Sequence, residues 1–239
     1  MKQNKPITIG ILAGMGPKST APFLELLVEE CQKQYGAKND IDFPHMIIYS
    51  LPTPFFVDQA IDDNRMEKII LAGLKKLERF DVDFIAMPCN SAHKYFPKLK
   101  ANLSTPLLNI VDATATRITK NTKRVTLLAT TKTNETKLYQ NKLKRKGIEV
   151  ILKDEWQLVI NNLITSVKAG SNSTRLSGLI KKLFQKFAAE HVDTLIIACT
   201  ELTKLFKNVK GFTVIDSSHA LAEETIKNYK IIQYRNENR

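Results

Sequence analysis

The chain has 239 residues, of which 43% are apolar and 25% are charged, and its formal net charge is +12. This length and composition allow one large domain or two small ones, exclude wholesale disorder, and leave no apolar run near the roughly 18 residues of a membrane-spanning helix. The lysines are spread along the chain without interleaved aromatic residues, which indicates a basic surface suited to an anionic small molecule rather than a nucleic-acid or membrane partner.

The first predicted element is a buried strand at residues 9–15. A basic start at residues 1–5 followed by an apolar stretch also resembles a signal peptide. Gly10, Gly14 and Gly16 interrupt that stretch, and no small-x-small cleavage site follows it. We therefore expect an uncleaved chain in the cytoplasm.

Strands and helices then alternate through the first half of the chain. A strand is predicted at residues 45–50 and an amphipathic helix at 66–80. The segment 81–91 contains a short apolar strand that ends at Cys89, and a further strand is predicted at 107–112. Short β-branched strands that alternate with helices are typical of a parallel sheet covered on both faces.

The second half repeats the first. Val82-Asp83 and Val192-Asp193 each precede an apolar run and a cysteine, and Cys89 and Cys199 lie 110 positions apart (199 − 89 = 110). The second copy has predicted strands at 125–131, 148–152, 192–199 and 212–216, a helix at 175–190, and a last helix at 221–232 that packs back on the first half.

The duplication predicts an α/β fold with two pseudo-symmetric parallel-sheet domains that face each other across a central cleft. We expect an N-terminal domain of residues 1–114 with 212–239, and a second domain of residues 115–211.

The cysteines are the candidate reactive groups. Three cysteines without C-x-x-C spacing exclude a disulfide scaffold and a zinc site. Cys89 and Cys199 end equivalent strands, where α/β sheets bind ligands, and a helix start there favours the thiolate. A thiolate and a thiol on opposite walls supply the base and the acid of a racemisation at a stereocentre. Cys31, in an apolar helical stretch, is expected to be an inert core residue.

Five motifs in chain order resemble the aspartate/glutamate racemase family from the first strand to the last helix. They are GILAGMGPKST (10–20), MPCNSAH (87–93), LLATTKT (127–133), VKAG (167–170) and ACTEL (198–202). The resemblance implies catalysis by Cys89 and Cys199, an aspartate- or glutamate-like amino-acid substrate, no cofactor or metal, and a homodimer. It also implies that Lys168, in a loop before Gly170, binds the substrate carboxylate. The remaining substrate-binding candidates are Met15, Asn90, Ser91, Ala92, Thr131, Thr133, Thr200 and Glu201.

One segment departs from that family. Dicarboxylate-specific members carry a Pro-Asp-Arg stretch after the second strand, whose arginine holds the side-chain carboxylate. Residues 51–58 contain no arginine here, and the nearest one is Arg65. A bidentate guanidinium is not easily replaced, so the reaction class is better supported than aspartate or glutamate as the substrate. Phe55 and Phe56 indicate either a more apolar pocket or core packing of the loop.

Nucleotide binding is not supported by the sequence. Residues 14–19 resemble a dinucleotide fingerprint, but Ser19 replaces its third glycine and no acidic residue ends the second strand. Pro17 before Lys18-Ser19 likewise breaks a phosphate-binding loop.

Several polar residues have two interpretations. His93, four residues after Cys89, could form a Cys–His nucleophile pair, although a helix-surface or supporting position is favoured. Glu201 could tune Cys199, bind the substrate ammonium or stabilise a helix start. Asp112 and Asp216 are expected to cap the helices that follow them. His45, His191 and His219 form no metal-ligand spacing with the cysteines.

Three other functions remain open at this point. A related cysteine-dependent isomerase or decarboxylase would use the same thiols. A non-catalytic two-lobed amino-acid binder has no use for a thiol on both walls. A basic nucleic-acid binder would show a steep dependence of affinity on salt.

Overall fold

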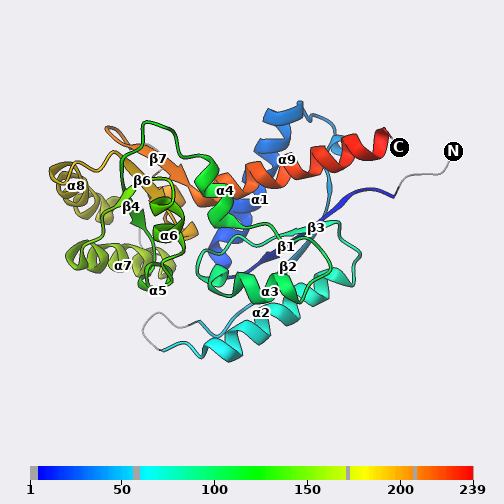
Figure 1. Ribbon diagram of the computed structural model, residues 1–239, viewed down its shortest axis with the longest axis horizontal. Coiled ribbons are helices and arrows are strands. Elements are labelled where there is room, and N and C mark those ends of the chain that lie inside the picture. The colour runs from blue at the N-terminus through cyan, green and yellow to red at the C-terminus, as the bar shows by residue number, and fades with distance from the viewer. Residues whose placement is uncertain (1–4, 56–59, 171–172, 207–208, 239) are drawn as a thin grey trace. The chain divides into compact units, whose positions relative to one another are not determined.

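The structure is a computed structural model that describes residues 5–55, 60–170, 173–206 and 209–238 (Figure 1). The chain divides into two compact units: Met1–Ile110 with His219–Arg239, which we call the first unit, and Val111–Ser218, the second unit. Each unit holds its own parallel sheet, so the predicted α/β class is confirmed. Within the described ranges, no helix is long and apolar enough to cross a membrane.

The first unit is built on a parallel three-stranded sheet in the order β2-β1-β3. Successive side chains of a strand point to opposite faces, and Leu12 of β1 lies on the face where it joins a core cluster with Ile85 and with apolar residues of α2. Both residues are completely buried. The strands are β1 (Thr8–Ala13), β2 (His45–Ser50) and β3 (Phe84–Ala86).

Helices cover both faces of this sheet, with α1 and α9 on one side and α2 on the other (Figure 1). In α2, Met66, Ile70 and Leu74 recur once per turn and are all buried, which is why this face packs on the sheet. The carboxylate of Asp62 caps the helix by accepting a hydrogen bond from Arg65 N at 3.0 Å. The helices are α1 (Thr20–Tyr35), α2 (Asp63–Glu78), α3 (Phe96–Ala101), α9 (Ser217–Glu237) and the 3₁₀ helices Pro17–Ser19, Asp40–Asp42 and Ser91–Tyr95.

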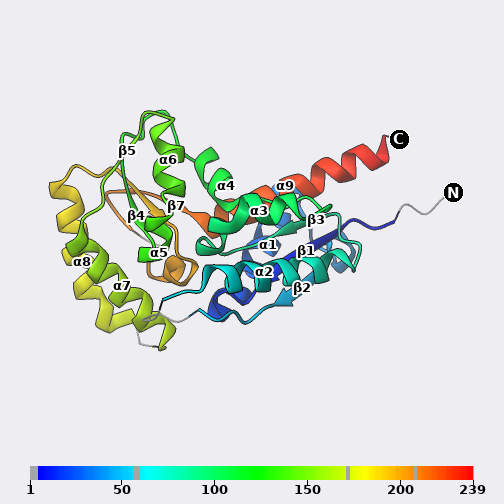
Figure 2. The same ribbon diagram turned by 60° about the horizontal axis from the view of Figure 1, so that its bottom comes forward.

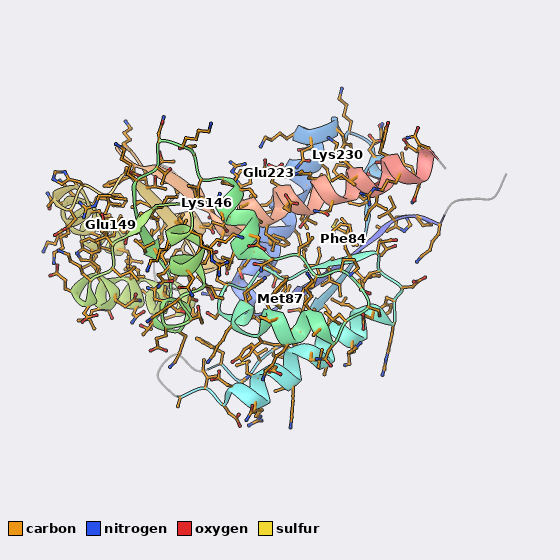
Figure 3. The ribbon with its side chains drawn as sticks, in the orientation of Figure 1. Phe84, Met87, Lys146, Glu149, Glu223 and Lys230 are labelled. Atoms are coloured by element: carbon orange, nitrogen blue, oxygen red, sulfur yellow. The ribbon has the colours of Figure 1, made fainter. Side chains whose placement is uncertain are left out.

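The last helix, α9, is held on α1 by polar contacts. The side-chain amide of Gln34 donates to the backbone oxygen of Glu223 at 3.0 Å, and Lys230 Nζ donates to the backbone oxygen of Gln34 at 3.0 Å. Figure 3 labels Glu223 and Lys230 along this helix. His219 Nε2 lies 3.0 Å from a carboxylate oxygen of Glu30, whose side chain is only 1% exposed. α9 therefore packs on the first half of the chain, as the sequence predicts.

The second unit is built on a parallel four-stranded sheet in the order β5-β4-β6-β7. Its core contains Trp156 and Phe187, whose rings meet edge to face with centroids 4.9 Å apart. Helices α7 and α8 lie side by side (Figure 2). The elements are α4 (Ile110–Thr116), β4 (Arg124–Leu128), α5 (Thr131–Glu135), α6 (Leu138–Lys144), β5 (Glu149–Val150), α7 (Asp154–Lys168), α8 (Ser173–Ala189), β6 (Thr194–Ile197), the 3₁₀ helix Thr200–Phe206 and β7 (Thr213–Asp216).

The repeated Val-Asp pair has the same structural role in both units. The carboxylate of Asp83 accepts a hydrogen bond from Thr8 N at 2.7 Å, where β1 begins. The carboxylate of Asp193 accepts one from Arg124 N at 2.8 Å, where β4 begins. Each aspartate precedes the strand that leads to the cysteine and holds that strand to its neighbour, β1 or β4. In doing so it satisfies a backbone N–H at the start of the neighbouring strand. Both copies also place a non-glycine residue at positive φ, Asp81 at 56° and His191 at 53°.

The strand predicted at residues 107–112 is wrong. Only Leu107 forms a bridge, to Ile85, and α4 begins at Ile110. The backbone N–H of Ile110 donates to the imidazole of His93 rather than to a neighbouring strand, so the sheet ladder stops there. Asp112 consequently lies in the first turn of α4, where it pairs with Lys142 at 2.7 Å, instead of ending a strand.

The boundaries of the two units also differ from the expected domain ranges. Residues 212–218 were expected in the N-terminal domain, but β7 pairs in parallel with β6, so this segment completes the second sheet. Residues 111–114 likewise belong to the second unit as part of α4. Asp216 ends β7 and its carboxylate accepts a hydrogen bond from Ser218 N at 2.7 Å, which confirms its predicted capping role at α9.

Glu78, at the end of α2, holds the turn that leads to Leu107. Its carboxylate accepts hydrogen bonds from Ser104 N at 2.8 Å, Ser104 Oγ at 2.9 Å and Thr105 N at 2.9 Å, and it pairs with Lys75 at 2.7 Å. Burial opposes ionisation, but Lys75 and these donors outweigh it and hold the pKa of Glu78 at about 2.

We expect Glu78→Gln to lower the free energy of unfolding at pH 7 by about 1–3 kcal/mol, because charge-assisted hydrogen bonds are lost. Since the folded-state pKa lies below the unfolded one, the contribution is complete above about pH 4.5 and disappears as the pH falls toward 2. Urea unfolding at pH 7, 5 and 3.5 should show the gap to the wild type narrowing. The control is Glu67→Gln, because Glu67 also lies on α2 and pairs with Lys98, whose side chain is exposed. This variant should lower the free energy of unfolding by less than about 1 kcal/mol. Equal losses in both variants at every pH would contradict this assignment.

Candidate active site

In the first unit, Met15 and Cys89 leave neighbouring parallel strands at the same edge of the sheet. β1 ends at Ala13 and β3 at Ala86, and the two strands pair in register, so the segments that follow them emerge together. Met15, Cys89 and Phe55 all pack against the core cluster that fills the α2 face. The predicted residues Met15 and Cys89 are therefore brought to one side of the same core. Figure 3 labels Met87, which continues β3 toward the cysteine.

The turn after β1 depends on Gly14. Its φ is +90°, and a Cβ added there would meet Leu51 N at 2.5 Å and Leu51 O at 2.8 Å, so no larger residue fits. Gly14 N donates to Thr20 Oγ1 at 3.2 Å, and Leu51 N donates to Ala13 O at 2.9 Å. These contacts fix the backbone on which Met15 sits.

The loop that carries Cys89 is ordered by backbone hydrogen bonds and by His93. Cys89 N donates to Met87 O at 2.8 Å, and His93 N donates to Asn90 O at 3.1 Å. Cys89 is half-buried, whereas Asn90 and Ala92 are buried. Of the two positions favoured for His93, the helix surface is wrong, since the residue is 1% exposed. The supporting position agrees with the structure, because the ring nitrogens contact the backbone of Cys89 and Ile110.

In the second unit, Cys199 belongs to a buried charged cluster. Cys199 Sγ donates to Glu201 Oε2 at 3.1 Å, and Glu201 Oε1 lies 3.4 Å from Lys168 Nζ. The side chain of Glu201 is 6% exposed and that of Lys168 is 27% exposed. Of the three interpretations of Glu201, the one in which it tunes Cys199 agrees with this hydrogen bond. Lys168 is not in a loop as expected, because it is the last residue of α7, which packs against the 3₁₀ helix after Cys199.

The protonation state of Cys199 differs from the sequence expectation. Burial, followed by the negative charge and hydrogen bond of Glu201, raises the pKa of the Cys199 thiol well above its usual range, and Lys168 offsets this only in part. The helix start after Cys199 is a 3₁₀ segment and does not outweigh these effects. Cys199 is therefore a neutral thiol, and the expectation of a favoured thiolate is wrong for this residue. Burial likewise raises the pKa of Cys31, which is 1% exposed in α1, as expected for a core cysteine.

The three threonines predicted to bind substrate in the second unit differ in their exposure and hydrogen bonds. Thr133 is 1% exposed, and its backbone N–H donates to Thr130 Oγ1, the cap of α5, at 3.1 Å. Thr131 is exposed, and its hydroxyl accepts a hydrogen bond from Asn161 Nδ2 at 2.9 Å. Thr200 Oγ1 lies 3.5 Å from the carboxylate of Glu201, beside the Cys199 cluster.

Asn161 was not found by sequence reasoning. It lies on α7 seven residues before Lys168, which is two helical turns, so both polar side chains come from the same face of that helix. Gln157, one turn earlier, donates to Ala129 O at 2.9 Å at the end of β4. The recurrence of Gln157, Asn161 and Lys168 at helical spacing was the signal available in the sequence.

Two further features bear on ligands. Phe56 and Asp58 of the segment that lacks an arginine lie outside the described residues, and Arg65 is exposed on α2. In the part of the chain that the structure describes, no group of three or more His, Cys, Asp or Glu residues could hold a metal ion.

The chain is thus a duplicated α/β protein, with a parallel sheet in each unit and a cysteine shortly after an equivalent strand in each. The family model for Asp/Glu/Hydantoin racemase matches residues 12–225. The chain is 45% identical over 226 residues to the broad specificity amino-acid racemase RacX of Bacillus subtilis (strain 168), covering 94% of this chain and 99% of that one.

Solved structures show the same similarity. The aspartate racemase of Picrophilus torridus aligns with a TM-score of 0.75 and 30% identity, over 94% of each chain. An aspartate racemase homologue from Pyrococcus horikoshii aligns with a TM-score of 0.76 and 26% identity, over 93% of this chain and 99% of that one. The chain belongs to the Asp/Glu/Hydantoin racemase family, and the family resemblance inferred from its motifs is confirmed. It is an isomerase of the amino-acid racemase type.

We expect opposite effects on the reactivity of Cys199 when the two charges beside it are removed. Glu201→Gln removes the negative charge that disfavours the thiolate and should speed alkylation at pH 8 by about threefold to tenfold. Lys168→Met removes a compensating positive charge and should slow alkylation. The measurement is the rate at which iodoacetamide modifies the Cys199 peptide, followed by mass spectrometry.

The control for this pair is Glu155→Gln, which removes an exposed carboxylate paired with Lys186 in the same unit and should leave the rate unchanged. A slower reaction in Glu201→Gln, or the same direction of change in both variants, would contradict the cluster as described.

Proposed function

We propose that this racemase interconverts L- and D-amino acids without a cofactor, using Cys89 and Cys199 as base and acid on opposite faces of the α-carbon. The observation that carries the proposal is the equivalence of the two thiols. Each follows the strand that pairs with the central strand of its own parallel sheet, and they lie 110 positions apart in a duplicated chain. The proposal requires both thiols to reach the α-carbon of one substrate.

The neutral thiol of Cys199 supports a specific starting state. In that state Cys199 carries the proton, and Cys89 acts first as thiolate base. The Cys89 thiolate removes the α-proton and becomes a thiol, while the electron pair of the C–H bond stays on the α-carbon as a carbanion that is delocalised into the substrate carboxylate. Cys199 then delivers its own proton to the opposite face of the α-carbon and becomes the thiolate. Reversal of these roles carries the reaction in the other direction.

Fixed dipoles around the thiols would stabilise the carbanion, which acid–base groups alone cannot do. We propose Met15, Asn90, Ser91 and Ala92 as the substrate-facing residues of the first unit, with the polar groups of Asn90 and Ser91 as donors. In the second unit we propose Thr131, Thr133 and Thr200. The contact between Lys168 and Glu201 supports a revised role for this pair, with the lysine holding the carboxylate beside Cys199 until a substrate carboxylate competes for it.

The side-chain preference is proposed to be broad rather than limited to aspartate and glutamate. Residues 51–58 contain no arginine that could pair with a side-chain carboxylate, and Phe55 packs against the same apolar core as Cys89. The relative that is 45% identical is described as a broad specificity racemase. The missing arginine favours substrates with uncharged side chains, and the relative's description supports a broad range of substrates.

Three further properties belong to this proposal. The thiols must stay reduced to exchange protons, which supports a cytoplasmic location. The proposed chemistry needs neither pyridoxal phosphate nor a metal, so hydroxylamine and EDTA should leave the activity unchanged. A homodimer, implied by the family resemblance, is testable by light scattering of the purified chain.

Exchange of the α-proton tests the two-thiol mechanism directly. In D₂O, the wild type should incorporate deuterium into both enantiomers of a substrate, as followed by NMR. Cys89→Ser and Cys199→Ser should each reduce racemisation by about 10²–10⁴-fold, because one positioned acid–base group is lost. Any exchange that remains in a variant should be confined to one enantiomer, and to a different one in each variant.

Cys31→Ala is the matched control, since it removes the third thiol from the core of α1, and it should keep exchange within about threefold of the wild type. Full exchange in either serine variant, or no exchange by the wild type with any amino acid, would overturn the two-thiol proposal.

The substrate preference is tested with a panel of aspartate, glutamate, alanine, methionine, phenylalanine, lysine and arginine under the same conditions. We expect kcat/KM to be higher for uncharged side chains than for aspartate by about tenfold or more, because a site without a paired cation must desolvate the extra carboxylate. Aspartate or glutamate as the best substrate would show that another cation replaces the missing arginine.

A further inference from the structure

The imidazole of His93 joins two backbone segments of the first unit. Nδ1 lies 2.8 Å from the carbonyl oxygen of Cys89, and Nε2 accepts a hydrogen bond from Ile110 N at 3.1 Å. The ring stacks on Phe96 with centroids 5.5 Å apart and planes 11° from parallel. With 1% of the residue exposed, this geometry is shielded from water.

These contacts fix the tautomer of the ring. Ile110 N–H can donate only to a nitrogen that carries a lone pair, so Nε2 is unprotonated. Nδ1 must then carry the hydrogen, which it donates to the carbonyl of Cys89. The carbonyl oxygen of Leu108 lies 3.5 Å from Nε2, too far to compete as an acceptor from this nitrogen. His93 is thus a neutral imidazole with one donor and one acceptor, and both are used on the backbone.

The partner on the other side of the ring lies at a distinctive position in the chain. Ile110 is the last residue of the first unit before the chain enters the second, and it is the first residue of α4. Its N–H is one of the helix-start donors that have no partner within the helix. His93 accepts a hydrogen bond from this donor and also donates one to the carbonyl of Cys89. The ring therefore links the backbone of Cys89 to Ile110, the last residue of the segment 1–110.

The second copy of the repeat has no imidazole at the equivalent position. Thr203 stands 110 positions after His93, and its buried Oγ1 makes no hydrogen bond to any described residue. There the carbonyl of Cys199 accepts a hydrogen bond from Leu202 N at 2.9 Å instead. Support by an imidazole is therefore a property of Cys89 alone.

We propose that His93 is a positioning residue for Cys89, which fixes the cysteine carbonyl and with it the backbone from which the thiol projects. The ring exchanges no proton in the reaction. This inference rests on the proposed function only in so far as Cys89 is taken to be one of the two proton-transferring thiols.

Two substitutions separate the two contacts of the ring. In His93→Asn, the amide nitrogen can replace Nδ1 and still donate to Cys89 O, whereas in His93→Gln the amide oxygen can replace Nε2 and accept only from Ile110 N.

His93→Gln should lower kcat by about tenfold to a hundredfold with little change in KM, because a displaced thiol affects proton transfer more than binding. His93→Asn should recover most of kcat. Thr203→Val, at the equivalent position of the second copy, is the control and should retain it.

A second readout does not depend on racemase activity. In a Cys199→Ala background, the rate at which iodoacetamide modifies the Cys89 peptide should change severalfold with His93→Gln and stay near the parent rate with His93→Asn. If the wild type racemises no amino acid but this pattern appears, the proposed function fails while the positioning role stands. Equal rates in the two His93 variants, for alkylation and for kcat, would overturn the positioning role.

A measurement on the wild type keeps the inference testable should a variant fail to fold. Nitrogen-15 NMR of the histidine-labelled protein should show one ring in the tautomer protonated only at Nδ1. None of the other three histidines is as deeply buried. If no such ring is found, or if the buried ring is protonated at Nε2, the arrangement proposed for His93 is wrong.

Discussion

In each unit an inner strand of the sheet pairs in parallel with the strand after which the cysteine lies, and the rest of the site depends on this pairing. β1 pairs with β3, and β4 pairs with β6. Parallel strands end at the same edge, so whatever follows them in the chain is brought together there. The repeated aspartates Asp83 and Asp193 fasten each pair at its opposite end, by accepting hydrogen bonds from the first residues of the central strands.

On this shared scaffold the two cysteines have different surroundings. The Cys199 thiol donates a hydrogen bond to a carboxylate that is itself paired with Lys168, and burial keeps the thiol neutral. Cys89 is more exposed, and a neutral imidazole holds its carbonyl. A racemase needs an acid and a base that can exchange roles, but nothing in that requirement makes the two environments identical. Under the two-thiol proposal, these unequal surroundings favour one proton arrangement in the resting enzyme.

Local sequence patterns predicted the strands well where the apolar runs were short and bounded. The strand at 45–50 was predicted with its observed bounds, and the helix predicted at 66–80 runs from Asp63 to Glu78, because both patterns follow from residue order alone. The segment 107–112 has an equally apolar pattern, yet only Leu107 joins the sheet. The difference is made by the hydrogen bond from Ile110 to His93, a partner that no periodicity can indicate. Similarly, β7 belongs to the second unit because its hydrogen-bond partner is β6.

The sequence by itself determined the duplication, the α/β class, the family and the equivalent positions of Cys89 and Cys199, because repeats and motifs are properties of residue order. Tertiary structure alone decided what each polar group touches: Lys168 pairs with Glu201, Asn161 with Thr131, and His93 with Cys89 and Ile110. The sign of the pKa shift of Cys199 was decided there too, since burial and a neighbouring carboxylate outweigh a helix start. Such contacts join residues from separate elements, and their energies depend on distance and burial, which are fixed only when the chain has folded.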